Sequence, residues 1–158
     1  MYQGKKVVVV MPAYNAEKTI IKTYNEVMAQ GVVDKVILVD DASPDNTVKV
    51  AERLPATKVF VHERNLGYGG NQKTCYRLAL EDGADIIIMV HPDYQYTPKL
   101  IPSMVNIIGE ELYPVVLGSR ILGMGARKGG MPMYKYIANR FLTFTQNTLI
   151  NYKLSEYH

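Results

Sequence analysis

Residues 6–15 read KVVVVMPAYN, a lysine and four valines followed by a turn-like segment that begins at Pro12. Such a short run of β-branched residues is typical of a strand that is buried on both faces, and we expect this strand to cover Lys6 to Met11. Between this run and the next ones, apolar residues recur with helical spacing. This alternation of strand-like and helix-like segments predicts an α/β fold, a mostly parallel central sheet flanked by helices. The other predicted strands are residues 35–39, 58–61, 85–90 and 115–117.

The composition is that of a globular protein. Of 158 residues, 47% are hydrophobic and 21% are charged, which indicates a single domain over residues 1–158 and excludes the disordered and fibrous classes. One cysteine and the lack of an apolar run of ~18 residues predict a cytoplasmic protein. A net charge of +3 is too small to indicate nucleic acid as a partner, although it permits peripheral contact with the inner, anionic face of a membrane.

Polar segments follow all of the predicted strands. Ligands of parallel sheets bind outside the carboxyl ends of the strands, so these segments mark the expected site. The first turn lacks the glycines of a dinucleotide-binding fingerprint, and the chain has no Gly-Lys-Ser/Thr phosphate loop, so phosphates would be bound by side chains or by a metal ion. The segments are Pro12–Asn15, Asp40–Asp45, Glu63–Asn71, His91–Gln95 and Gly118–Arg120.

Asp40 and Asp41 are adjacent carboxylates at the end of a predicted buried strand. Paired carboxylates in a cleft are costly unless they receive donors or a cation, and ribose hydroxyls or a base N–H group would serve. The alternative is that one caps the next helix while the other is solvated. Tyr14 offers a ring that can stack on a base, with ordinary packing as its alternative.

His91 and Asp93 stand two residues apart after the most apolar predicted strand. Imidazole and carboxylate are ligands of Mn²⁺, and carboxylate oxygens also suit Mg²⁺. A nucleoside diphosphate would complete the shell of an ion that has so few protein ligands. Arg120 adds a guanidinium suited to phosphate oxygens. The alternatives are a histidine bonded to backbone and a solvated surface arginine.

Residues 118–132 contain five glycines, with Arg127 and Lys128 between them. Glycine has the greatest backbone freedom, so this stretch predicts a mobile loop that closes over an anionic ligand. The alternative is a solvent-exposed connector with ordinary surface charges.

Five segments of this sequence together carry a family resemblance. They read VVVVMPAYN, VILVDDASPDNT, HERNLGYGGN, HPDYQ and GSR, in this order along the chain. The series resembles the family 2 glycosyltransferases of GT-A fold, closest to the dolichyl-phosphate mannose synthase-like branch. The resemblance implies a Rossmann-like GT-A fold and a hexosyltransferase that inverts the anomeric carbon of a UDP- or GDP-sugar. It also implies a divalent metal, Mn²⁺ or Mg²⁺, and a lipid-phosphate or saccharide acceptor.

The resemblance implies roles for individual residues as well. Residues at the nucleotide would be Pro12, Ala13, Tyr14, Asn15, Asp40, Asp41 and Gly67. Metal binding would involve Asp93, His91 and Gln95, and catalysis would involve Asp93, Arg120 at the diphosphate and Glu156 as the base. Arg127 and Lys128 would belong to the loop that covers the donor.

Two departures from the family pattern leave alternatives open. His91 stands where the family has the first Asp of its D-x-D motif, which removes a negative charge from the metal site. The chain stops at His158, before the family's acceptor-side segment, so we expect a truncated domain whose exposed apolar surface favours a homo-oligomer. The alternative functions are a non-catalytic nucleotide-sugar-binding module and a sugar nucleotidyltransferase, whose glycine-rich loop is missing after the first strand.

Overall fold

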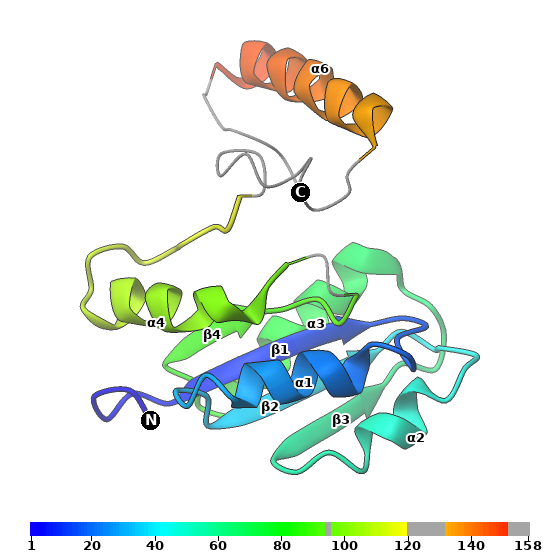
Figure 1. The fold of residues 1–158 in the computed structure, drawn as a ribbon, viewed down its shortest axis with the longest axis vertical. Coiled ribbons are helices and arrows are strands. Elements are labelled where there is room, and N and C mark those ends of the chain that lie inside the picture. The colour runs from blue at the N-terminus through cyan, green and yellow to red at the C-terminus, as the bar shows by residue number, and fades with distance from the viewer. Residues whose placement is uncertain (94–95, 120–131, 152–158) are drawn as a thin grey trace. The chain divides into compact units, whose positions relative to one another are not determined.

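The structure is a computed structural model that describes residues 1–93, 96–119 and 132–151 (Figure 1). Strands and helices alternate along most of the chain. The strands are β1 (Val7–Ala13), β2 (Lys35–Asp40), β3 (Thr57–Val61) and β4 (Ile86–Met89). The helices are α1 (Ile20–Met28), α2 (Thr47–Ala51), α3 (Gly67–Glu81), the 3₁₀ turn η1 (Pro98–Leu100), α4 (Ile101–Gly109) and α6 (Met133–Ile150).

The four strands form one parallel sheet in the order β3-β2-β1-β4, which confirms the predicted parallel sheet and its first four strands. In the register of the sheet, Val9 of β1 pairs with Val36 of β2 and with Ile88 of β4. The chain moves outward from β1 to β3 and then crosses back to β4 on the other side of β1. This reversal opens a crevice at the carboxyl ends of β1 and β4, where parallel sheets bind ligands.

Helices cover both faces of the sheet because successive valines of β1 point to opposite sides. Helices α1, α2 and α4 lie on one face, and Val9 shares a buried core there with Ile20 of α1 (Figure 1). Helix α3 lies on the other face, where Val8 packs with Leu78 and Cys75. Burial raises the pKa of the Cys75 thiol to about 12, which keeps the thiol protonated at neutral pH.

The predicted fifth strand at residues 115–117 is wrong. These residues have no strand assignment, and the side chains of Val115 and Leu117 are exposed. A strand requires a neighbour to receive its backbone hydrogen bonds, and the sheet among the described residues ends at β4. The carboxyl edge of the sheet therefore contains four strand ends among the described residues, whereas five were predicted.

The chain divides into two compact units, Met1–Val116 and Leu117–His158. The first contains the sheet, and the described part of the second contains α6. Among the described residues, no helix is both long enough and apolar enough to cross a membrane. The expectation of one domain over residues 1–158 stays a prediction.

Candidate functional site

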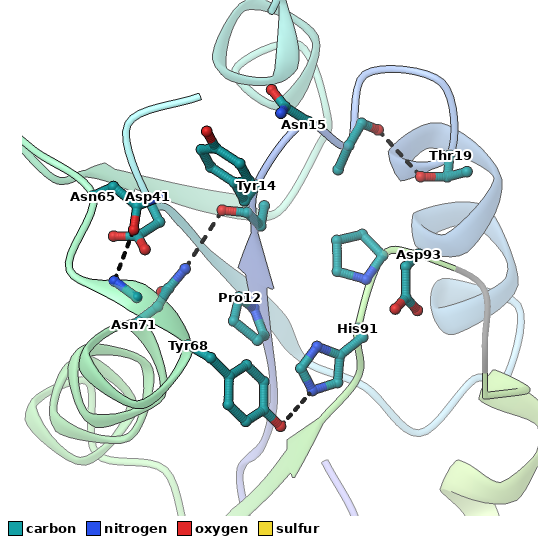
Figure 2. Close-up of a pocket in the computed structure, with 14 residues that line it drawn as sticks. Pro12, Tyr14, Asn15, Thr19, Asp41, Asn65, Tyr68, Asn71, His91 and Asp93 are labelled. Atoms are coloured by element: carbon teal, nitrogen blue, oxygen red, sulfur yellow. Dashed lines mark hydrogen bonds between the residues drawn. The ribbon is translucent and has the colours of Figure 1, made fainter. Parts of the chain in front are cut away.

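A pocket of about 330 Å³ lies at the carboxyl edge of the sheet, within the first unit (Figure 2). It is lined by the segments that follow β1, β2 and β4 and by the beginning of α3. The lining residues are Pro12, Ala13, Tyr14, Asn15, Ala16, Thr19, Asp41, Asn65, Gly67, Tyr68, Asn71, His91, Pro92 and Asp93. Pockets of this size hold small ligands, and this one lies at the reversal of the strand order.

Hydrogen bonds tie the segment after β1 to the segment after β2. The amide of Asn15 donates to Oγ of Ser43 at 2.9 Å, and the amide of Ala16 donates to Oγ1 of Thr47 at 2.8 Å. Asn15 has φ +54°, in the left-handed region that asparagine tolerates better than most residues. These bonds hold this rim of the pocket in place before any ligand arrives.

The two adjacent aspartates have different surroundings. Asp40 is fully buried, and its carboxylate accepts hydrogen bonds from the amide and the hydroxyl of Ser43 at 2.8 and 2.5 Å, so it stabilises the turn after β2. Asp41 lines the pocket, and its Oδ1 accepts from the amide of Leu66 and from Nδ1 of His62, both at 2.8 Å. The pocket lining therefore contains one aspartate of the pair.

Two glycines shape the beginning of α3, and one asparagine joins this helix to the strand ends. Gly67 has φ +74°, a conformation that side chains rarely adopt, and a Cβ on Gly70 would lie 2.7 Å from Cβ of Leu66. One turn later, the buried Asn71 donates from Nδ2 to the carbonyl oxygens of Val39 at 3.0 Å and Ala13 at 3.4 Å. Asn71 thus joins α3 to the ends of β2 and β1.

On the β4 side, His91 lies beside Tyr68 of α3. The Tyr68 hydroxyl is 3.2 Å from Nε2 of His91, and the two rings stack with centroids 5.3 Å apart (Figure 2). Burial, followed by the neighbouring Tyr96, raises the pKa of Tyr68, so its hydroxyl keeps its proton at neutral pH. Figure 2 shows Asp93 in the same segment after β4.

Two side chains near the end of β4 could provide part of the coordination shell of a metal ion, with a bound ligand providing the rest. Within residues 1–93, 96–119 and 132–151, no group of three or more His, Cys, Asp and Glu side chains can hold a metal ion. The lining does include the imidazole of His91 and the carboxylate of Asp93, which are acceptable ligands of Mn²⁺. These two residues fit part of a coordination shell whose remaining positions are left to a ligand or to water.

The pocket brings together eight of the residues singled out from the sequence and leaves others outside. The eight are Pro12, Ala13, Tyr14, Asn15, Asp41, Gly67, His91 and Asp93. Asp40 is fully buried and is not among the lining residues. The predictions for Gln95, Arg120, Arg127, Lys128 and Glu156 fall outside the residues that the structure describes.

No individual role was predicted from the sequence for His62, Tyr68 or Asn71. His62 directly follows β3, so the rule that strand ends carry the site could have found it. Tyr68 and Asn71 belong to the segment Glu63–Asn71 that was expected at the site, but the sequence does not distinguish them from their neighbours. Their importance follows from contacts to residues that are distant in the sequence.

The fold is that of GT-A glycosyltransferases. A crystal structure of glucosyl-3-phosphoglycerate synthase from Mycobacterium tuberculosis, in complex with Mn²⁺, uridine diphosphate and phosphoglyceric acid, is similar with a TM-score of 0.55 and 25% identity. The likeness covers 67% of this chain and 39% of the synthase. It confirms the predicted fold class.

The sequence profile of the family described as Glycosyl transferase family 2 matches residues 8–158, so the chain belongs to this family. It is 32% identical to the UDP-N-acetylglucosamine–dolichyl-phosphate N-acetylglucosaminyltransferase of Methanococcus voltae, over 96% of this chain and 66% of that protein. It is 25% identical to the dolichol-phosphate mannosyltransferase of Pyrococcus furiosus, over 85% of this chain and 38% of that protein. The chain is thus related to lipid-phosphate sugar transferases and spans less than two thirds of either relative.

Proposed function

We propose that this chain binds a UDP- or GDP-sugar in the pocket at the carboxyl edge and transfers the sugar, with inversion, to a lipid-phosphate or saccharide acceptor. One observation carries the proposal: a single pocket combines Tyr14 and Asp41 at the ends of β1 and β2 with His91 and Asp93 after β4. Membership of family 2 and the names of the relatives support the same reaction class.

The nucleoside would occupy the side of the pocket near β1 and β2. The Tyr14 side chain is about half exposed, so one ring face is available for stacking on a base. Asp41 would accept a hydrogen bond from a ribose hydroxyl or from an N–H group of the base. The ordered turn of Asn15 would keep this half of the pocket in a binding conformation, which lowers the entropy cost of binding.

The diphosphate would lie near the end of β4. His91 and Asp93, with Gln95 as a further candidate, would hold Mn²⁺ or Mg²⁺ there; when bound, such an ion offsets the negative charge that develops on the departing nucleoside diphosphate. Tyr68 would fix the orientation of the His91 ring through the contact at Nε2.

The acceptor oxygen would attack the anomeric carbon opposite the diphosphate, and the bond to the diphosphate oxygen would break as the new bond forms. Arg120 would balance charge on the leaving group, and Arg127 and Lys128 would cover the donor. A saccharide hydroxyl would lose its proton to Glu156, whereas a lipid phosphate is already ionised and needs no base. We place this reaction in the cytoplasm, with a lipid-linked acceptor reached at the inner face of a membrane.

A pair of variants on either side of β4 tests the proposal. Titration calorimetry with UDP and GDP, with and without Mn²⁺, is expected to show that Mn²⁺ strengthens nucleotide binding to the wild-type chain. Asp93→Asn should raise the nucleotide Kd in the presence of Mn²⁺ about tenfold or more, because it weakens a metal ligand. Asp85→Asn is the matched control, since Asp85 precedes β4 and accepts from the amide of Lys6 at 2.7 Å. Equal affinities in all three proteins would contradict the metal role.

A second candidate function is a non-catalytic module that binds nucleotide sugars. The observation that favours it is His91, which supplies no negative charge and has Nε2 next to the Tyr68 hydroxyl. Measured release of nucleotide from UDP- and GDP-sugars separates the two functions. The enzyme releases nucleotide at a rate that Asp93→Asn lowers, whereas the module binds the donor and releases none.

A further inference from the structure

A chain of hydrogen-bonded side chains lies directly behind the pocket wall. Oδ1 of Asp41 is 2.8 Å from Nδ1 of His62, and Nε2 of His62 is 2.9 Å from Oγ1 of Thr74 in α3. The side chains of Asp41 and His62 are only 4% and 7% exposed. The chain Asp41–His62–Thr74 therefore connects the pocket wall to the middle of a core helix.

The direction of these bonds determines which oxygen of Asp41 is left for a ligand. An ionised carboxylate only accepts hydrogen bonds, so Nδ1 of His62 carries the hydrogen. The amide of Leu66 also donates to Oδ1. Oδ2 receives no hydrogen bond from the part of the chain that the structure describes, residues 1–93, 96–119 and 132–151. Because Asp41 lines the pocket, Oδ2 is the oxygen that a ligand donor would meet.

We infer that His62 is a positioning residue for donor recognition, which holds Asp41 by Oδ1 so that Oδ2 accepts from the nucleoside. This inference rests on the proposed function, because it names how the nucleoside half of the same pocket is ordered. Two bonds on Oδ1 fix the rotation of the carboxylate before binding, and this preorganisation removes an entropy cost from nucleotide binding.

The ring of His62 is itself held from two sides. Thr74 bonds its Nε2, and Phe60 meets the ring edge-on with centroids 5.5 Å apart. An apolar side chain would fill this space with less desolvation than an imidazole. The buried polar ring is therefore explained by the hydrogen bond that it delivers to Asp41, and Thr74 keeps it in the orientation that delivers it.

Two substitutions separate positioning from packing. In His62→Asn the amide nitrogen takes the place of Nδ1, so the bond to Asp41 is kept and the bond to Thr74 is lost. In His62→Gln the side-chain amide takes the place of Nε2, so a hydrogen bond to Thr74 is kept, with the amide nitrogen donating to Oγ1 while the Thr74 hydroxyl donates to the Gly70 carbonyl, and the bond to Asp41 is lost. A packing role predicts more damage from asparagine, because it is smaller; a positioning role predicts the opposite order.

The measurement is titration calorimetry of the full chain with UDP and with GDP, each with Mn²⁺, and with Mn²⁺ and inorganic pyrophosphate as the probe that lacks a nucleoside. His62→Gln is expected to raise the nucleotide Kd about tenfold, and His62→Asn to stay within about threefold of wild type. The pyrophosphate Kd is expected to be the same in all proteins. Thr74→Val, which keeps both His62 and Asp41, is expected to raise the nucleotide Kd about threefold and also serves if His62→Gln does not fold.

The results of these titrations distinguish a positioning role of His62 from a structural role. Wild-type nucleotide affinity in both His62→Gln and Thr74→Val overturns the inference and leaves the proposed function standing. Weaker binding of nucleotide and pyrophosphate alike, or a larger loss in His62→Asn than in His62→Gln, identifies a structural role and also overturns it. A wild-type chain that binds neither UDP nor GDP overturns the proposed function and the inference together.

Discussion

At the amino edge of the sheet, carboxylates are bonded to lysines and backbone amides, whereas at the carboxyl edge two carboxylates line a pocket. Asp82 accepts from Nζ of Lys35 at 2.6 Å and of Lys6 at 2.8 Å, and Asp34 accepts from the amide of Val7 at 2.8 Å. At the opposite edge, Asp41 and Asp93 line the pocket beside Tyr14.

The amino edge of the sheet contributes to stability, whereas the carboxyl edge contains the candidate binding site. The acidic groups at the amino edge stabilise the starts of β1 and β2, and the lysine hydrogen bonds hold the pKa of Asp82 at about 2. At the carboxyl edge, Asp41 and Asp93 line a pocket that can hold a ligand, and groups that serve a ligand are not selected for stability alone. Substitutions at the two edges should therefore change different measured quantities.

The largest effect on binding is expected for Asp41→Asn. The substitution keeps Oδ1 for His62 and the Leu66 amide but replaces Oδ2 by an NH₂ donor, which faces the donor groups of the nucleoside. Loss of a charge-assisted hydrogen bond predicts a nucleotide Kd raised about 10- to 100-fold by titration calorimetry. Asp40→Asn, one residue away and outside the lining, should act mainly on stability through the Ser43 turn. A larger binding loss in Asp40→Asn would reverse the assignment of the pair.

A smaller loss of affinity is expected for Tyr14→Ala. Stacking of a base on an aromatic ring contributes about 1–3 kcal/mol, so the nucleotide Kd should rise about tenfold while the pyrophosphate Kd does not change. Tyr113→Ala is the control, because Tyr113 is also exposed but lies outside the pocket lining. Equal nucleotide affinities in the two variants would show that the Tyr14 ring does not contact the base.

Asp82→Asn should leave nucleotide binding unchanged and lower the free energy of unfolding by about 1 kcal/mol at neutral pH. The pKa of Asp82 is about 2 in the folded chain against a usual value of 3.8, so the folded state binds fewer protons. Its contribution is therefore complete above about pH 4 and is lost as the pH falls toward 2. Denaturant unfolding of both proteins across this range should show the curves converging at low pH. Curves that stay parallel would argue against the ion pairs with Lys6 and Lys35.

Much of the fold and part of the candidate site could be predicted from local sequence. The valine run of β1 and the polar residues after it are adjacent in the chain, so both the strand and its end were predictable. The different roles of Asp40 and Asp41 were not, because successive strand residues point to opposite sides and the sequence does not say which side holds the pocket. His62 acquires its role only when the end of β3 lies beside Asp41. Residues 115–117 have the composition of a strand, but no strand among the described residues pairs with them.

A crystal structure with UDP or GDP and Mn²⁺ will show whether the carboxyl edge of the sheet holds a nucleoside diphosphate. We predict a base beside Tyr14, a nucleoside donor on Oδ2 of Asp41, and the diphosphate next to His91 and Asp93. A nucleotide bound elsewhere, or a pocket that stays empty at concentrations that saturate binding in solution, would contradict the claim.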